Sequence, residues 1–366
     1  MTLSDFRYMV WAKTHRPARY DLSQSGLEVP PVGLLDLARA AVEGSPGVRA
    51  TLERSGPDMP DEVRQRVARR FGLPAERLML TLGTSHGLFL ACRTLLEPGD
   101  LALCERPAYE VLATLPAMVG ARVEHVDRGA SAGWRLPATL SAEIVRLRPR
   151  LLVLSNPHNP TGAQLGSEEL LSVAEALERV GGVLLVDEVY LEFSARAAEQ
   201  SLGRVGRNVV VVSSLTKAFG LGNVRFGWLA AEAALVARAL RVNDYLTVLY
   251  PSPCAWVGHH ALDALPALQR RAEAVRRQNL PIVQAWIDSR ADVGWHPSEA
   301  AVIGLLELRG IADTTRWCAE LHDRWDTLVV PGEFFAAPGH VRLGFGCAPE
   351  LLREGLARIG HALDAR

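Results

Sequence analysis

The sequence predicts an α/β protein built around a mostly parallel β-sheet with helices on both faces. Short apolar runs of strand length recur along the chain, at 78–82, 101–104, 151–154, 183–186 and 209–212. Helical patterns separate these runs, which is the alternation that parallel sheets require. Polar or ionisable residues directly follow four of the runs. Because ligands of open α/β sheets bind beyond the carboxyl ends of the strands, these residues are candidates for one common site.

Helices are expected at 34–42, 61–71, 167–180 and 262–287. The second of these carries Val63, Val67 and Phe71 on one face. The last is arginine-rich and leads to two further expected strands, at 301–308 and 341–345. We therefore expect three parts: an N-terminal arm (1–32) without strong periodicity, a large domain (33–265), and a smaller α+β C-terminal domain (266–366).

Composition excludes several classes of protein. A net charge of −1 over 366 residues leaves no basic surface for nucleic acid. The five cysteines are scattered and form no CxxC pair, which argues against a zinc site and for reduced thiols. No apolar run has the length of a membrane span or a signal-peptide core. We expect a cytoplasmic protein with neither a membrane nor a nucleic-acid partner.

Lys217 is the most informative single residue. It follows the 209–212 strand, and the sequence holds only one other lysine, Lys13, among its 40 lysines and arginines. Arginine cannot replace lysine where a free amine must attack a carbonyl, because its guanidinium stays protonated. Lys217 is therefore a candidate Schiff-base residue. A stray surface lysine in an arginine-rich chain is the alternative.

Gly83, Thr84 and Ser85 follow the 78–82 strand and open a helical run. Free backbone amides and two hydroxyls at a helix start can cradle a phosphate. The same stretch, through Gly87, fits the G-x-S-x-G pattern of a hydrolase nucleophile elbow. Both interpretations stay open from the residues alone.

Four more candidates stand beside strand ends or turns. Tyr109 follows the 101–104 strand and could stack on a flat ring, or pack in the core. Asn159 offers an amide in a loop shaped by two prolines and a glycine. Asp187 ends an apolar strand, where a carboxylate is costly unless a cation meets it. Gly26 could let backbone approach a ligand closely, or simply turn the chain.

With these residues placed, the chain resembles the fold-type I pyridoxal-phosphate enzymes of the class I/II aminotransferase family, from about residue 21 to Leu343. Four elements occur in the family's order: 159–162 (Asn-Pro-Thr-Gly), 187–190 (Asp-Glu-Val-Tyr), 214–217 (Ser-Leu-Thr-Lys), and Arg225. Each alone is a modest signal, and the ordered set is a strong one. The resemblance implies a large domain of this fold with pyridoxal 5′-phosphate as cofactor.

The resemblance also implies roles for these residues. Lys217 would hold the cofactor as an internal aldimine and move a proton on the substrate, while Asp187 would pair with the ring nitrogen. The remaining roles concern the cofactor's other groups and the substrate: Asn159 and Tyr190 at the phenolic oxygen, Tyr109 on the ring, Gly83, Thr84, Ser85, Ser214 and Arg225 at the phosphate, and Arg342 with Gly26 at the substrate carboxylate.

The implied activity is transfer of an amino group from an α-amino acid to a 2-oxo acid, in a homodimer. One departure keeps other reactions open. Members usually have a tyrosine that reaches the phosphate across the dimer interface, but here no tyrosine lies between Tyr20 and Tyr109. Elimination at the β- or γ-carbon, cyclisation and decarboxylation remain alternatives, with a serine hydrolase using Ser85 as a remote one. From the resemblance we also expect cis bonds before Pro160 and Pro107.

Overall fold

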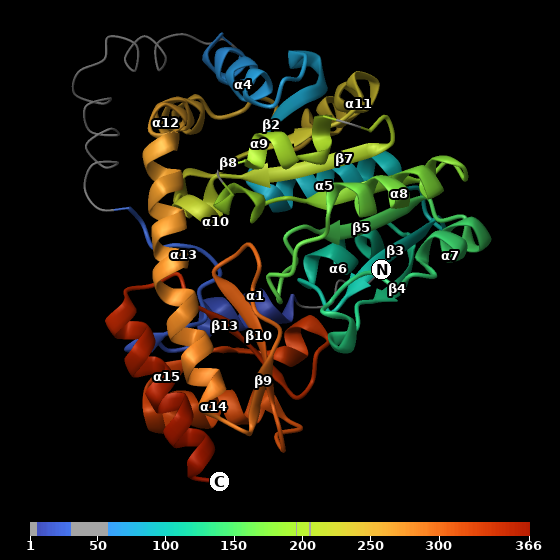
Figure 1. Ribbon diagram of the computed structural model, residues 1–366. Helices are drawn as coiled ribbons and strands as arrows, with labels where there is room; N and C mark the ends of the chain where they lie inside the picture. Colours follow the sequence, from blue (N-terminus) through green and yellow to red (C-terminus); the bar gives the residue numbers. More distant parts are fainter. Residues whose placement is uncertain (1–5, 31–57, 195, 205) are drawn as a thin grey trace.

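The computed structural model describes residues 6–30, 58–194, 196–204 and 206–366 (Figure 1). The helix expected at 34–42 lies outside these residues. The helix expected at 61–71 is present as α4 (Asp58–Arg70). Its Val63 and Val67 are fully buried, as the apolar face predicted from the sequence requires.

A seven-stranded sheet forms the centre of the larger part of the molecule. In spatial order its strands are β2 (Leu78–Leu82), β8 (Phe226–Ala230), β7 (Val209–Ser214), β6 (Val183–Asp187), β5 (Leu151–Ser155), β3 (Leu101–Arg106) and β4 (Arg122–Asp127). The pairs from β7 to β4 are parallel, whereas β8 runs antiparallel to both of its neighbours. The five strands predicted from apolar runs are all present, and the mostly parallel sheet is confirmed.

Helices cover both faces of this sheet. Successive residues of a strand point to opposite faces, so each strand contributes side chains to two cores. Val153 and Leu185 pack with α5 (Thr84–Leu95), α6 (Val111–Met118) and α11 (Ala233–Asn243). Their neighbours Leu154 and Leu184 pack on the other face with α7 (Leu140–Leu147) and α8 (Ser167–Glu178). A sheet that is buried on both faces therefore requires strands made of continuous apolar runs.

A second, antiparallel sheet forms the smaller part. Its strand order is β12 (Val330–Pro331), β13 (His340–Gly344), β10 (Ile303–Leu308) and β9 (Val293–Trp295), and α14 (Thr314–Trp325) and α15 (Pro349–Asp364) accompany it. The long helix α13 (Leu265–Asp288) follows α12 (Ser252–Asp263) and runs from the large sheet to the small one (Figure 1). Pro281 lies inside α13 without ending it. None of the helices in the described ranges is long and apolar enough to cross a membrane.

The N-terminal arm is more ordered than the sequence suggests. It contains the helix α1 (Arg7–Thr14) and a short strand β1 (Tyr20–Asp21) that pairs in parallel with β11 (Thr327–Leu328). Beyond β1 the arm runs against the end of β13, where the Gly344 amide donates to the carbonyl of Leu22 at 2.7 Å. A Cβ on Gly344 would overlap the backbone carbonyl of Gln24. The arm is thus packed on the small sheet at backbone contact distance.

We predict that Gly344→Ala destabilises the protein by about 1–3 kcal/mol, because a methyl group cannot fit between two backbones. Gly129→Ala is the matched control, since its new Cβ would find only the Ser131 hydroxyl, at 3.8 Å. Chemical denaturation of both variants measures the difference. Equal stability of Gly344→Ala and wild type would show that the arm does not pack on β13 in solution.

Candidate active site

The carboxyl ends of three neighbouring strands bring the predicted residues together. The register pairs Ser155 at the end of β5 with Asp187 at the end of β6, and Asp187 with Val212 of β7. The chain then enters the short helix α10 (Thr216–Phe219), which carries Lys217. The loop with Asn159 follows β5 directly, so these side chains share one edge of the sheet.

Lys217 lies under the N-terminal arm. Its Nζ donates to the Ser25 hydroxyl at 2.7 Å, and its carbonyl accepts from the Leu27 amide at 2.8 Å. A Cβ on Gly26 would come within 2.8 Å of that carbonyl oxygen, so this position requires glycine. Burial lowers the pKa of Lys217, with Arg342 among the groups that add to the effect. A lowered pKa provides more of the free amine that a Schiff base needs.

Asp187 is a buried carboxyl that forms no ion pair within the described ranges. It is 6% exposed, and its Oδ1 accepts from the Val189 amide at 2.9 Å. No arginine or lysine of the described ranges forms an ion pair with it. Burial raises the pKa of Asp187 to about 7. A protonated ring nitrogen placed beside it would supply the missing cation, which fits a pyridine cofactor.

The neighbouring Glu188 has a different environment although it also follows β6. Its carboxylate accepts from the Ser201 hydroxyl at 2.5 Å and from the Leu202 amide at 2.9 Å. Both partners lie in the segment between β6 and β7. Glu188 therefore anchors a loop, and Asp187 is the acid that remains for a ligand.

Arg342 of β13 meets the Asn159 loop. The side chain is wholly buried, and its Nη1 donates to Asn159 Oδ1 at 3.3 Å. That contact leaves the Asn159 Nδ2 group as a donor for another partner. The Nη2 of Arg342 donates to the Ser23 carbonyl at 2.9 Å, while its Nε has no partner in the described part of the chain. Arg342 thus retains donor capacity inside a buried site.

Two tyrosines border the same space. Tyr190 is 1% exposed, and its hydroxyl has no hydrogen-bond partner in the described ranges. An orphaned buried hydroxyl fits the phenolic oxygen of the expected cofactor. Tyr109 precedes α6, and burial raises its pKa, with Tyr190 and Asp187 among its charged or ionisable neighbours. Tyr109 packs against one of the two cores of the large sheet, and its ring contacts that of Tyr8 edge to face.

The start of α5 forms a cradle suited to a phosphate. Gly83 has φ +78° and caps the helix without a side chain, so the amides of the first turn stay free of a side-chain cap. The Thr84 hydroxyl donates to the Ser214 hydroxyl at 3.0 Å. Arg225 donates through Nη2 to the carbonyl of Leu82 at 2.8 Å, and a Cβ on Gly83 would collide with this guanidinium. Hydroxyls, amides and a guanidinium therefore converge at the start of α5, where the family resemblance implies a phosphate site.

Ser85 is exposed on the first turn of α5, and no hydrogen bond joins its hydroxyl to a histidine of the described ranges. The adjacent His86 accepts instead from the Leu82 amide, at 3.1 Å through Nδ1. The G-x-S-x-G stretch thus matches a phosphate cradle, and these contacts do not build a hydrolase triad.

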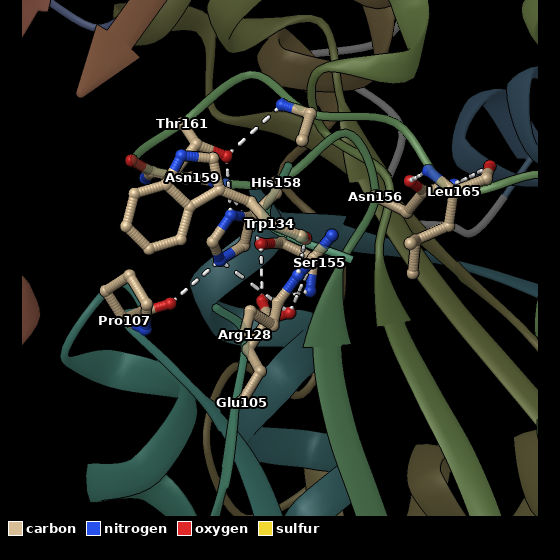
Figure 2. A network of polar contacts seen from close by, with 11 residues as sticks. Glu105, Pro107, Arg128, Trp134, Ser155, Asn156, His158, Asn159, Thr161 and Leu165 are labelled. Atoms are coloured by element: carbon tan, nitrogen blue, oxygen red, sulfur yellow. Dashed lines mark hydrogen bonds and ion pairs between the residues drawn. The ribbon is translucent and has the colours of Figure 1, made fainter. Parts of the chain in front are cut away.

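A buried charged pair lies beneath the Asn159 loop (Figure 2). Glu105 and Arg128 are joined at 2.7 Å with both side chains at 0% exposure. Glu105 also accepts from the Ser155 amide at 2.6 Å and hydroxyl at 2.7 Å, and the Ser155 hydroxyl accepts from the Asn159 amide at 3.1 Å. The pair is thus linked through Ser155 to the position of Asn159.

His158 ties two of the site's loops together (Figure 2). Its Nε2 donates to the carbonyl of Pro107 at 2.8 Å, and its Nδ1 accepts from the Thr161 hydroxyl at 2.7 Å. Burial, followed by the charge of Arg128, holds the pKa of His158 well below its usual value. A neutral histidine therefore connects the Tyr109 segment to the Asn159 loop.

Sequence reasoning missed several of these residues. Glu105 ends an apolar strand just as Asp187 does, so the same argument could have found it. Tyr8 and Ser25 lie on the arm, which has no periodic signal. The expected cis bond before Pro107 is confirmed, but the one expected before Pro160 is wrong, because the second cis bond precedes Pro157. The Gly162 amide donates to the His158 carbonyl at 2.7 Å, which closes a helix-like turn across Pro160.

Known proteins resemble the chain over most of its length. The family model of aminotransferase class I and II matches residues 39–359. Arginine–pyruvate transaminase AruH of Pseudomonas aeruginosa is 30% identical over 312 residues, which cover 81% of this chain and 79% of the relative. Capreomycidine synthase of Streptomyces vinaceus is 29% identical over 354 residues, covering 94% of this chain and 90% of the relative.

The solved structure of the PLP-dependent cyclase OrfR shares the fold, with a TM-score of 0.88 and 28% identity, covering 100% of this chain and 98% of that one. Pyridoxal 5′-phosphate is the cofactor that the family match implies. Within the described part of the chain the Tyr190 hydroxyl forms no hydrogen bond and Asp187 forms no ion pair, and with the cradle at α5 these groups fit that cofactor. The chain belongs to the class I and II aminotransferase family and is a pyridoxal-phosphate-dependent enzyme of fold type I.

Proposed function

We propose that this enzyme transfers the amino group of an α-amino acid to a 2-oxo acid, with Lys217 as the catalytic lysine. The observation that carries the proposal is the unneutralised charge of Arg342. The side chain is wholly buried, and in the described ranges no aspartate or glutamate forms an ion pair with it. A buried guanidinium without an anion is costly, and a substrate carboxylate would neutralise it through charge-assisted hydrogen bonds.

The proposed chemistry divides between cofactor and chain. Bound pyridoxal phosphate supplies an electron sink that makes the substrate's α-hydrogen acidic. Lys217 receives that proton on Nζ and later returns it, which its lowered pKa favours. Arg342 holds the carboxylate and fixes the orientation of the α-carbon. Asp187 in its ionised form keeps a proton on the ring nitrogen, and Gly26 allows the arm to close over Lys217.

We propose that the remaining site residues hold the cofactor. Asn159 through Nδ2 and Tyr190 through its hydroxyl donate to the phenolic oxygen. Tyr109 covers the ring. The phosphate is held by the amides and side chains of the cradle: Gly83, Thr84, Ser85, Ser214 and Arg225. A planar guanidinium such as that of Arg225 can bind phosphate through two parallel hydrogen bonds.

Cyclisation of an amino acid is the second candidate, because the resemblance to capreomycidine synthase spans 94% of the chain and the OrfR cyclase spans all of it. The two reactions share the cofactor, the lysine and the carboxylate-binding arginine. They differ in where the amino group ends. Transamination would release the substrate as a 2-oxo acid without its nitrogen, whereas cyclisation would keep that nitrogen in the product.

We predict that one molar equivalent of a suitable amino acid converts the cofactor of the holoenzyme to pyridoxamine phosphate and releases the matching 2-oxo acid. The change is followed by absorbance and by mass spectrometry of the small molecules. Arginine with pyruvate is the first pair of a panel, since the relative AruH is named for them. A product formed while the cofactor stays in its aldehyde form would favour cyclisation, elimination or decarboxylation over transfer.

A second prediction concerns the cost of burying the Asp187 charge. The pKa of the Asp187 carboxyl is 3.8 in an ordinary environment, and burial raises it to about 7. Ionisation therefore destabilises the folded apoprotein, by an amount that is absent below pH 3.8, grows as the pH rises and is complete above pH 7. Asp187→Asn should stabilise the apoprotein at pH 8 by about 2–4 kcal/mol while lowering turnover of the holoenzyme by orders of magnitude.

Thermal and denaturant unfolding of cofactor-free protein between pH 4 and pH 8 measure this effect. Asp127→Asn is the control, because Asp127 is exposed, is paired with Arg106 and has a lowered pKa, so its replacement brings no gain at pH 8. An Asp187→Asn apoprotein less stable than wild type at pH 8 would contradict the assignment.

We also propose a homodimer, and a cytoplasmic location on the basis of the five scattered cysteines. The segment after α11 presents Tyr245, Leu246, Val248 and Leu249 to solvent, at 91%, 51%, 67% and 59% exposure. Contiguous apolar surface of this kind marks interfaces. The next residue, Tyr250, donates through its hydroxyl to the carbonyl of Arg225 at 3.2 Å. A second subunit seated on this segment would therefore lie beside the phosphate cradle.

Replacing Leu246 and Leu249 together by aspartate should convert the protein to monomers, because two charges would be buried at the interface. Analytical ultracentrifugation compares this variant with wild type and with Val145→Asp. Val145 is 48% exposed on α7, far along the chain from the segment, and its replacement should leave a dimer. A monomeric wild-type protein with full activity would overturn the proposal.

A further inference from the structure

Helix α1 carries Tyr8 into the site. The Tyr8 amide donates to Glu110 Oε2 at 3.2 Å, at the start of α6. Its ring meets Tyr109 edge to face, with centroids 5.8 Å apart at 86°, and lies 5.9 Å from the ring of Phe335. Tyr109 and Glu110 belong to the larger part of the molecule, and Phe335 belongs to the smaller part. Tyr8 is therefore packed between the two parts.

The Tyr8 hydroxyl reaches the guanidinium of Arg342. Arg342 donates through Nη2 to this hydroxyl at 3.0 Å, and its Cζ lies 5.4 Å from the ring centroid. The phenol is an acceptor in this bond, and its own hydrogen has no acceptor in the described part of the chain. Arg342 Nε is a second donor without a partner there. Two unused donors beside one buried cation call for an anion.

The pKa of Tyr8 also reflects the positive charges around its hydroxyl. Burial raises the pKa of Tyr8, but Arg342 and Lys217 together outweigh it and leave the pKa below its usual value. The hydroxyl is therefore close to both the candidate Schiff-base lysine and the candidate carboxylate-binding arginine. An α-amino acid that contacted both groups would bring its carboxylate to the guanidinium that this hydroxyl touches.

We propose that Tyr8 is a substrate-binding residue, whose hydroxyl donates a hydrogen bond to the α-carboxylate held by Arg342. The N-terminal arm would then supply part of the binding site for the substrate. This inference rests on the proposed function, since it takes Arg342 to be the carboxylate site. The rival arrangement is competition, in which the phenol occupies the carboxylate's place and must leave before substrate binds. The two arrangements predict opposite effects of removing the hydroxyl.

Tyr8→Phe removes the hydroxyl and keeps the ring in its aromatic contacts. Tyr20→Phe is the matched control, because Tyr20 is also on the arm and accepts from an arginine, Arg358 Nη2, at 3.2 Å. The probe is 2-aminoisobutyrate, an α-amino acid that carries the amino and carboxylate groups but has no α-hydrogen to transfer. Isopropylamine, which is the same molecule without its carboxylate, is the control ligand. Absorbance of the cofactor in the holoenzyme reports binding of both.

We expect Tyr8→Phe to weaken binding of 2-aminoisobutyrate about tenfold, the value of one hydrogen bond to a charged group, and to leave isopropylamine unchanged. Tyr20→Phe should alter neither. Tighter binding of 2-aminoisobutyrate by Tyr8→Phe would establish competition and overturn the proposal, as would unchanged binding. Arg342→Gln distinguishes a failure of the Tyr8 inference from a failure of the proposed carboxylate site. If Arg342→Gln weakens binding of 2-aminoisobutyrate while Tyr8→Phe does not, only the Tyr8 inference fails. If Arg342→Gln has no effect, the proposed carboxylate site fails as well.

Discussion

The constraint on which this structure depends is the burial of charge at the carboxyl edge of an apolar sheet. Ionisable groups placed there must be neutralised by the chain or by a ligand. Glu105 is neutralised within the chain by Arg128 and by two hydrogen bonds from Ser155. Asp187 and Arg342 have no counter-ion in the described ranges. This contrast separates the charges that are neutralised within the fold from those that the proposed cofactor and substrate would neutralise.

The two kinds of charge are coupled through short contacts. Ser155 bonds to the structural Glu105 on one side and to the Asn159 amide on the other. Asn159 in turn accepts from Arg342, a residue of the small sheet. A ligand that neutralised Arg342 would therefore act at a point where the two sheets and the buried pair meet. Rigid support of this kind is what orients groups precisely enough for catalysis, because small displacements are costly in rate.

Much of this arrangement could be predicted from the sequence, because its signals are local. An apolar strand followed by a polar residue led to Asp187 and Lys217 without any knowledge of the strand order. The position of β2 beside β8, and the antiparallel direction of β8, depend on contacts about 150 residues apart and leave no local pattern. Tyr8 was missed for the same reason, since its partner Arg342 is 334 residues away. The arm's helix α1 has no buried residue and hence no periodic apolar face to detect.

The central claim is that Lys217 is the residue that binds pyridoxal phosphate covalently. Reduction of the holoenzyme with borohydride, followed by peptide mass mapping, tests it most directly, because the chain contains only one other lysine. The account predicts that the phosphopyridoxyl group is found on the peptide that contains Lys217, in nearly stoichiometric amount. A label on Lys13, or no label on protein saturated with the cofactor, would contradict it.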